Sequence, residues 1–406
     1  MKTLGVILIT LVALVPGWST VLHLTVMTFG ALRYRSDPPS LDVPRHRLLV
    51  VVPAHDEELV LGATLDAITA DMRRGDRLLV VDDRSTDRTG EIAARAGAVV
   101  VTRRPGETPG RAPARQTALE HAARLDWDAI VMIDADSIIE PGFFDACDRM
   151  LATGAEALQV RSEASLGRRA VDLAALVSFA VQGVVLPRAR DQWGLLVRLR
   201  GTGMVLRRSL LARFAFRAPA SEDLVYSLDL CRAGVRVRHV DEARLRSQNA
   251  GSWRVAADQK VRYEAGRIAA AREAVGDLLR SRSRAGFEAA WFLVSPPIAT
   301  AATLLVVSTV FGLVWSVTWL AASGFVGLGV LAGGVLLAAT TAGIGWRIHV
   351  AVAAAPVYLV WKVVVSLRTV LSVARRVDEF GATDRVPVGP DHLADISAER
   401  PWRDQG

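Results

Sequence analysis

The sequence predicts an α/β protein with a doubly wound, mainly parallel sheet, flanked by transmembrane helices. Between residues 48 and 133, short apolar runs alternate with helix-length amphipathic segments, which is the pattern of strands and crossover helices in a parallel sheet. Long apolar stretches lie toward both ends of the 406-residue chain, and 51% of all residues are hydrophobic. These observations indicate a water-soluble middle domain between membrane segments.

Four strands and three helices account for the first part of this middle domain. The expected strands cover Leu48–Val52, Leu78–Val81, Ala98–Val101 and Ala129–Ile133, and the expected helices cover Glu58–Arg74, Ser85–Ala96 and Ala112–Leu125. The run Ala129–Ile133 is wholly apolar and rich in branched residues, as expected of a strand that is buried on both faces. Downstream, Met204–Leu206 is predicted to be a strand and Leu224–Ala233 a helix.

The apolar segments predict a multi-pass protein of the cell membrane. Residues 1–32 are expected to form an N-terminal transmembrane anchor, and residues 291–345 two transmembrane helices, Phe292–Leu320 and Gly324–Gly345. In the second of these, Gly329 and Gly333 have the spacing of small residues that favours close helix packing.

Charged residues set the expected orientation. Four arginines closely follow the first apolar segment and a single lysine precedes it, so the positive-inside bias places the domain of residues 45–285 in the cytoplasm. The third apolar segment, residues 346–376, contains Lys362 and Arg368 and is therefore expected either to span the membrane or to lie along its surface. Residues 377–406 form a polar tail.

The overall charge and the cysteines limit the class of partner. The formal net charge is +7, and basic residues gather at the edges of the apolar segments, which indicates contact with a membrane surface and anionic substrates. No basic run is interleaved with aromatic residues, so nucleic acid is not an expected partner. Cys147 and Cys231 are the only cysteines and predict neither a disulfide framework nor a zinc site.

Polar clusters follow three of the expected strands, at the edge where open parallel sheets bind ligands. They comprise Pro53–Glu58, Asp82–Thr89 and Asp134–Asp136. One such cluster alone would be a turn with helix-capping carboxylates, whereas three at one edge favour a binding site. Asp134 and Asp136 point the same way on an extended backbone and suit Mg²⁺ or Mn²⁺ bridged to a diphosphate. The alternative for this pair is that both are solvated turn residues or helix caps before Pro141.

Seven motifs in order along the chain resemble the nucleotide-sugar domain of glycosyltransferase family 2. They are VVPAHDEE at Val51, VDDRSTDRT at Val81, ARQTAL at Ala114, DAD at Asp134, GTGMVLRR at Gly201, SED at Ser221 and QKVRY at Gln259. The resemblance covers Leu48 to about Ala270, and the segment APVYLVWK at Ala355 is similar to one in membrane-bound members. It implies the nucleotide-diphospho-sugar transferase (GT-A) fold and an inverting, metal-dependent transfer.

The resemblance also implies a role for each matching residue at the donor. Asp83 and Glu57, with the loop that contains Pro53 and His55, would hold the uracil and ribose of a UDP-sugar. Arg115 stands where the family usually has lysine and would contact the nucleotide or the diphosphate. Asp136, together with Asp134, would hold the metal ion on the diphosphate.

On the acceptor side, the resemblance makes Asp223, with Glu222 beside it, the expected catalytic base. The alternative is that both acids cap the helix Leu224–Ala233, and both statements can hold at once. The stretch Gly201, Thr202 and Gly203 either brings the backbone close to the acceptor or the sugar, or forms an ordinary turn.

Gln259, Arg262 and Tyr263 resemble the Q-x-x-R-W element of processive polysaccharide synthases, which lies near the donor diphosphate and the acceptor end. Tyrosine replaces the tryptophan here, which puts processivity in doubt. An amphipathic helix with a solvated arginine is the alternative for this stretch.

The expected function is that of a membrane-bound inverting glycosyltransferase acting on a lipid or glycan acceptor at the cytoplasmic face, alone, as a homodimer or with a membrane partner. A processive β-polysaccharide synthase that also exports its polymer is the first alternative. A sugar nucleotidyltransferase would need a glycine-rich basic loop after the first strand, whereas residues 53–58 are acidic and lack glycine. A non-catalytic membrane scaffold that keeps the fold is the remaining alternative.

Overall fold

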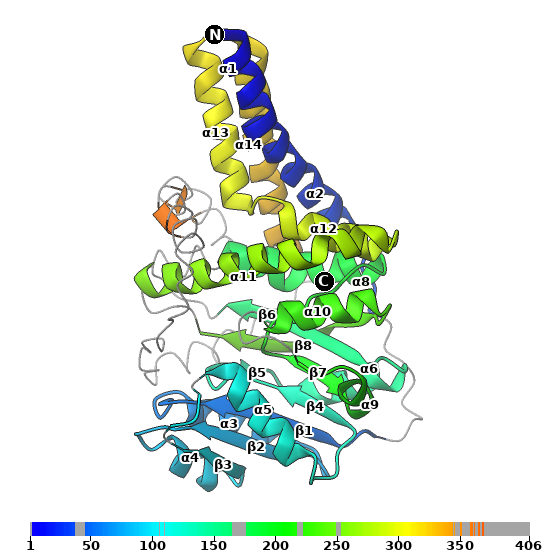
Figure 1. Ribbon diagram of the computed structural model, residues 1–406. Coiled ribbons are helices and arrows are strands. Elements are labelled where there is room, and N and C mark those ends of the chain that lie inside the picture. The colour runs from blue at the N-terminus through cyan, green and yellow to red at the C-terminus, as the bar shows by residue number, and fades with distance from the viewer. Residues whose placement is uncertain are drawn as a thin grey trace.

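The computed structural model describes residues 2–36, 45–104, 106–108, 110–164, 176–216, 222–248 and 253–343, with scattered residues between 345 and 368. In this part of the chain an α/β domain is joined to a bundle of long apolar helices (Figure 1). Residues 37–44, Ser221, most of the segment 346–376 and the tail 377–406 lie outside the described residues.

The first half of the sheet is parallel and has the predicted strands. Strands β1 (Leu48–Ala54), β2 (Arg77–Asp83), β3 (Val99–Arg103) and β4 (Ala129–Met132) lie in the order β3-β2-β1-β4, connected through helices α3 (Leu61–Asp71), α4 (Thr89–Arg95) and α5 (Arg111–Ala122). Alternate residues of β1 enter two cores: Val50 packs with residues of α3, and Val51 with residues of α5. Because both faces are covered, all four residues of β4 are buried, as the apolar run predicted.

The second half of the sheet is mixed, so antiparallel pairs join the parallel ones that were predicted to dominate. Strands β7 (Met204–Arg207), β6 (Ala157–Ala164), β8 (Val237–Ser247) and β5 (Ser137–Ile139) complete the order β3-β2-β1-β4-β7-β6-β8-β5, with antiparallel pairs β4–β7, β7–β6 and β8–β5 and a parallel pair β6–β8. Strands β6 and β8 carry arginines and acids that pair across the sheet, such as Arg246 with Glu163, so no apolar run marks them in the sequence.

Helices cover this second half and connect it to the bundle. They are α6 (Phe143–Ala152), the π-helix η2 (Ala180–Val185), α8 (Leu186–Gln192), α9 (Arg208–Arg213), α10 (Glu222–Arg232), α11 (Trp253–Arg280) and α12 (Arg284–Val294). Figure 1 shows α11 and α12 lying across the base of the bundle, between it and the sheet.

The bundle consists of α1 (Lys2–Ile9), the π-helix η1 (Thr10–Leu14), α2 (Val15–Leu32), α13 (Ile298–Val314) and α14 (Thr318–Thr341). Within the described residues, Thr3–Leu32 and Thr318–Thr341 are each long and apolar enough to cross a membrane. Helices α12 and α13 would form a third such span if counted as one helix bent by 62°.

The structure corrects the predicted helix Phe292–Leu320. The chain breaks at Ser295 because the two prolines that follow cannot continue the hydrogen-bond ladder, and a new helix begins at Ile298. Since α13 ends at Val314, Leu320 belongs to α14.

The glycines that let the helices approach are also different from those expected. A Cβ added at Gly329 or Gly333 would meet nothing within 4 Å. A Cβ at Gly324 would lie 2.4 Å from Thr309 Oγ1, and one at Gly312 would lie 2.4 Å from the backbone nitrogen of Ala321. Close packing of α13 on α14 therefore depends on Gly312 and Gly324.

Candidate active site

Two loops at the carboxyl ends of β1 and β2 are joined by hydrogen bonds. The His55 ring donates from Nδ1 to the carbonyl of Asp83 at 2.6 Å, and the Glu57 N–H donates to Thr89 Oγ1 at 2.8 Å. Asp56, at a positive φ of 52°, accepts from the N–H of Thr86 at 2.7 Å. Several motif residues thus shape the loop, so Pro53, His55 and Glu57 are presented on a fixed backbone.

The Asp83 side chain is buried, and most hydrogen-bond acceptor positions of its carboxylate are already used. Its Oδ1 accepts from Arg103 Nη1 at 2.6 Å and from Arg84 Nε at 3.0 Å, and its Oδ2 accepts from the N–H of Gly110 at 3.2 Å. A carboxylate offers about four acceptor positions, so one position on Oδ2 remains for a ligand donor. Arg103 was not identified from the sequence, because it lies on a neighbouring strand twenty residues away.

The D-x-D turn after β4 is held by three other elements. The N–H of Asp134 donates to Thr202 Oγ1 at 3.1 Å, and the carbonyl of Ala135 accepts from Thr64 Oγ1 at 2.7 Å. The carbonyl of Asp136 accepts from the N–H of Gln248 at 3.3 Å. The two carboxylates are therefore carried by a turn whose backbone is fixed by neighbours from α3, from the residue that follows β8 and from the stretch before β7.

Arg111 connects the carboxylates of the site and was not foreseen from the sequence. Its Nη1 lies 3.2 Å from Asp134 Oδ2, and its side chain is 62% exposed. The pKa of Arg111 is raised by Asp134 first and then by Asp136, Glu57 and Asp223. Four carboxylates from three separate segments thus act electrostatically on one exposed guanidinium at the first turn of α5.

The residues present suit a divalent ion held jointly with a diphosphate. Among the described residues, no group of three or more histidine, cysteine or acidic side chains could hold a metal by itself. Magnesium sites commonly use one or two carboxylates and complete the shell with substrate phosphates and water. Asp134 and Asp136 meet that requirement, and the exposed guanidinium already drawn to Asp134 indicates that this point attracts cations.

Glu222 and Arg115 form a buried ion pair. Arg115 Nη1 lies 2.6 Å from Glu222 Oε1, and the guanidinium carbon is 5.0 Å from the centre of the Phe216 ring. Burial raises the pKa of Glu222, Asp223 raises it further, and Arg115 opposes the shift. The structure thus pairs two residues for which the resemblance implied separate roles.

Asp223, in the first turn of α10, lies beside the glycine-rich stretch before β7. Its Oδ1 accepts the N–H of Leu224 at 2.8 Å, and its Oδ2 is 3.6 Å from where a Cβ on Gly201 would be. Gly201 and Gly203 have positive φ angles of 80° and 65°. A side chain on Gly201 would stand against the carboxylate, so this glycine keeps the space beside Asp223 open.

A buried glutamine of β6, Gln159, holds the backbone of residues 200–202 by two hydrogen bonds. Its Nε2 donates to the carbonyl of Thr202 at 3.0 Å, and its Oε1 accepts the N–H of Arg200 at 3.0 Å. Thr202 in turn accepts a hydrogen bond from the D-x-D turn, so one continuous set of hydrogen bonds connects that turn to the segment beside Asp223. Gln159 could have been suspected only as a polar residue in an otherwise buried strand.

On helix α11, the side chains of Gln259, Arg262 and Tyr263 have different surroundings. The Gln259 side chain is exposed. Burial lowers the pKa of Arg262, and the positive charge of Arg111 lowers it further. Tyr263 instead accepts a hydrogen bond on its hydroxyl from Arg198 Nη1 at 2.6 Å.

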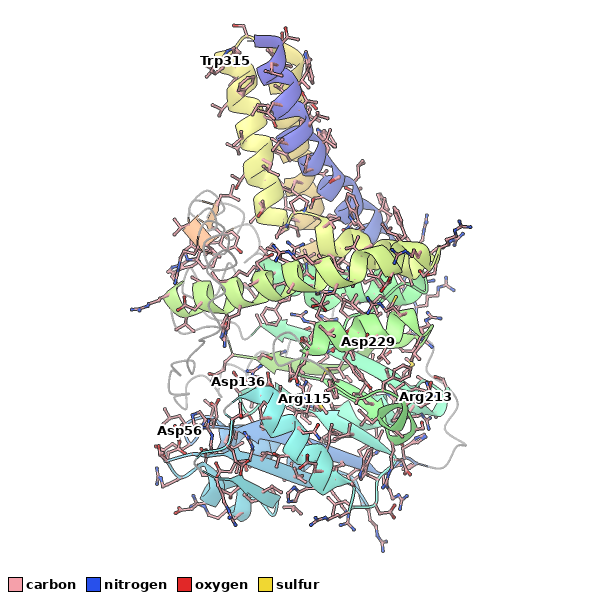
Figure 2. All side chains as sticks on the ribbon, viewed as in Figure 1. Asp56, Arg115, Asp136, Arg213, Asp229 and Trp315 are labelled. Carbon is pink, nitrogen blue, oxygen red and sulfur yellow. The ribbon has the colours of Figure 1, made fainter. Side chains whose placement is uncertain are left out.

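The D-x-D turn and Arg115 lie within the sheet domain, and Asp223 lines a cavity that reaches toward the bundle. Figure 2 shows Asp136 and Arg115 in the sheet domain on the side of α11, Asp56 at the outer margin and Trp315 at the far tip of the bundle. A cavity of about 550 Å³ begins at Asp223 and extends among the helices of the bundle.

The comparisons with known proteins agree with this geometry. Residues 44–266, more than half of the chain, match the family described as "Glycosyltransferase like family 2". The probable glycosyltransferase YdaM of Bacillus subtilis (strain 168) is 24% identical over 239 residues, which cover 54% of this chain and 55% of that relative. The uncharacterized glycosyltransferase Rv0539 of Mycobacterium tuberculosis (strain H37Rv) is 42% identical over 96 residues, 23% of this chain and 38% of that relative. The chain thus spans about half the length, or less, of these curated relatives.

A solved structure of TM-score above 0.5 shares the fold. The mannosyltransferase PcManGT from Pyrobaculum calidifontis, in complex with GDP-Man and Mn²⁺, is 18% identical with a TM-score of 0.51, covering 89% of this chain and 99% of that one. Glucosyl-3-phosphoglycerate synthase from Mycobacterium tuberculosis, in complex with Mn²⁺, UDP and phosphoglyceric acid, is 25% identical with a TM-score of 0.40, covering 54% of this chain and 76% of that one.

Proposed function

Since the chain belongs to the glycosyltransferase-like family 2, we propose that it moves a sugar from a nucleotide-diphospho-sugar, expected to be a UDP-sugar, to a hydroxyl of a lipid or glycan acceptor. The observation that carries the proposal is the hydrogen-bonded connection from the D-x-D turn through Thr202 to the segment beside Asp223. This connection joins a candidate diphosphate site to a candidate base across the edge of one sheet.

At the donor end, Asp134 and Asp136 would hold Mg²⁺ or Mn²⁺ together with the diphosphate. When bound, such an ion supplies positive charge that offsets the charge developing on the departing nucleoside diphosphate. Arg111 and Arg262 bring guanidinium groups to the same end, where they stabilise phosphate oxygens. The remaining acceptor position on Asp83 would take a donor N–H or hydroxyl from the nucleoside.

At the acceptor end, Asp223 would take the proton of the acceptor hydroxyl as its oxygen bonds to the anomeric carbon. The bond from that carbon to the diphosphate breaks, and its electron pair leaves with the nucleoside diphosphate. A single displacement of this kind inverts the anomeric centre, so an α-linked donor gives a β-linked product.

A location at the cytoplasmic face of the membrane is part of the proposal. Its support is the two apolar helices long enough to span a bilayer, the bent pair α12–α13, and the arginines that flank these segments. A processive synthase has less support, because the hydroxyl of Tyr263, in the place of the expected tryptophan, is engaged by Arg198.

Donor turnover tests the proposal. The full chain in lipid nanodiscs is offered UDP-, GDP- and dTDP-sugars with Mg²⁺ or Mn²⁺, and released nucleotide is measured with and without a membrane lipid extract. Metal-dependent release from one donor, lost in Asp136→Ala and kept in the exposed-surface control Asp66→Asn, is the expected result. Binding of neither nucleotide nor metal by the folded chain would favour a scaffold instead.

A further inference from the structure

The cavity between the sheet domain and the bundle has one charged end and one apolar end. Asp223, Arg198, Arg200, Lys260 and Tyr263 line the charged end. The apolar end is lined by side chains from the long helices, including Leu24, Ile298, Ala302, Leu328, Leu331 and Val335. With about 550 Å³, the cavity is of the size that holds small organic ligands.

Five cationic residues from the sheet domain and α11 line this cavity, and two of them are matched by carboxylates. Arg190 pairs with Glu288 at 2.7 Å, and Arg267 pairs with Glu264 at 3.0 Å. Arg267 also donates to three carbonyls where α12 ends, so it holds the helix break in place. These two arginines are structural and leave little capacity for a ligand.

The other three cations, Arg198, Arg200 and Lys260, have no carboxylate within 4.0 Å among the residues that the structure describes. Arg198 donates to the Tyr263 hydroxyl and to Gln182 Oε1, both at 2.6 Å. The buried Nη1 of Arg200 has no hydrogen-bond partner in that same part of the chain. An unpartnered buried guanidinium nitrogen is costly, and a bound anion would satisfy it.

The three cations also act on one another. Burial lowers the pKa of Arg200 to about 10, with Arg198 contributing in the same direction. Burial likewise lowers the pKa of Lys260; Glu264 opposes this shift, while Arg267, Arg200 and Arg198 add to it. Two carboxylates line the cavity, Asp223 and Glu264, and Glu264 is paired with Arg267. Among the described residues, Asp223 has no arginine within 4.0 Å. The three cations therefore outnumber the one carboxylate at this end, so its net charge is positive.

The apolar end shows what the ligand must carry besides the anion. It reaches between α2, α13 and α14, the segments apolar enough to lie in a bilayer, and the break at Ser295–Pro297 forms part of its wall. A small water-soluble phosphate would leave this part of the cavity unfilled. An amphiphile with an anionic headgroup and hydrocarbon chains matches both ends.

We propose that the sugar acceptor is an anionic phospholipid with a hydroxyl in its headgroup, which enters from the bilayer and places its phosphate on Arg198, Arg200 and Lys260. The inference rests on the proposed function and names its acceptor class. The headgroup hydroxyl lies at Asp223, its oxygen bonds to the anomeric carbon, and its proton passes to the carboxylate. The bond between the anomeric carbon and the diphosphate breaks, and its electron pair leaves with the nucleoside diphosphate. The lipid phosphate is unchanged.

Lipid binding can be tested without any donor. The full chain in a neutral detergent is titrated with fluorescently labelled phosphatidylglycerol, which has both the phosphate and free hydroxyls. Saturable binding that unlabelled phosphatidylglycerol displaces, and that phosphatidylcholine or sn-glycerol 3-phosphate displaces at least tenfold less well, is expected. Equal displacement by phosphatidylcholine would overturn the headgroup assignment, and equal displacement by sn-glycerol 3-phosphate would mean a site for a soluble phosphate.

Variants assign the two ends of the cavity separately. The double variant Arg200→Gln/Lys260→Gln should bind labelled phosphatidylglycerol at least tenfold more weakly, whereas Arg95→Gln, on the exposed side of α4, should bind it like the wild type. Ala332→Trp, which fills the apolar end without touching a charge, should also weaken binding at least tenfold. Wild-type affinity in both the double variant and Ala332→Trp would refute the proposal.

The same preparation separates this inference from the proposed function. Nucleotide and Mn²⁺ binding are titrated without lipid, and radiolabel from the best donor is then followed into phosphatidylglycerol or phosphatidylcholine. Label in phosphatidylglycerol alone supports the inference. Donor breakdown with no label in phosphatidylglycerol would overturn the acceptor assignment and leave the transferase standing, whereas tight lipid binding with no nucleotide binding would remove the transferase.

Discussion

Removing the cation of the buried pair Arg115–Glu222 should destabilise the domain, and the loss should depend on pH. Both side chains are about nine-tenths buried, and their charged atoms lie 2.6 Å apart. Breaking a buried ion pair by deleting one partner costs about 3–5 kcal/mol, because the other charge remains buried without compensation. In Arg115→Met that charge is the carboxylate of Glu222.

The pH dependence follows from the pKa of Glu222. Burial already raises it above the ordinary value, and Arg115 opposes that rise, so Arg115→Met should raise the pKa further. A folded-state pKa above the unfolded one contributes stability at low pH that is lost as the pH rises through the folded value. The variant should therefore be closer to the wild type at pH 5 than at pH 8.

Thermal unfolding of the full chain in detergent measures both effects. With about 2–4 °C per kcal/mol for a domain of this size, Arg115→Met should lower Tm by at least about 6 °C at pH 8, and by less at pH 5. Adding Glu222→Gln should recover part of the loss, and Arg95→Met should stay within about 2 °C, as expected of a surface change. An unchanged Tm at both pH values, with a loss only in nucleotide affinity, would refute the structural role of this pair.

Two further predictions concern glycines. Gly203→Ala should lower the free energy of unfolding by about 1–3 kcal/mol and weaken nucleotide binding, because the added Cβ would lie 2.3 Å from Val160 Cγ2 at a residue with positive φ. Gly154→Ala, at a residue with positive φ but no atom within 4 Å, is the matched control in the same thermal unfolding assay. Gly324→Leu should disrupt packing of α13 on α14 and reduce the yield of monodisperse protein in gel filtration, whereas Gly329→Leu should not, since nothing lies within 4 Å of that position. Equal behaviour within either pair would contradict the contacts described here.

The parallel half of the sheet could be predicted because its strands are buried on both faces. Strands such as β4 are then continuous apolar runs, and each polar cluster marks the point where a strand ends. The second half could not, because β6 and β8 exchange ion pairs between arginines and acids in place of an apolar pattern. A strand that is stabilised by cross-strand charges has no periodic signature of its own.

The candidate site was predictable in its motifs but not in its supporting contacts. Asp134, Asp136 and Asp223 were identified from local pattern and resemblance. Gln159 and Arg111 were not, since a buried amide and an exposed arginine gain their meaning only from partners far along the chain. In the same way, the sequence spacing of small residues favoured Gly329 and could not show which side of α14 faces α13.

The most direct test of the account is the turnover of Asp223→Asn beside the wild type, in nanodiscs with saturating donor, Mn²⁺ and acceptor lipid. A positioned base contributes about 10²–10⁴-fold to rate, so kcat should fall by that factor while nucleotide affinity and Tm stay near their wild-type values. Addition of EDTA to the wild type should abolish its turnover, because EDTA removes the Mn²⁺. Wild-type kcat in Asp223→Asn, with donor still consumed and lipid still labelled, would contradict the assignment of this residue as the base.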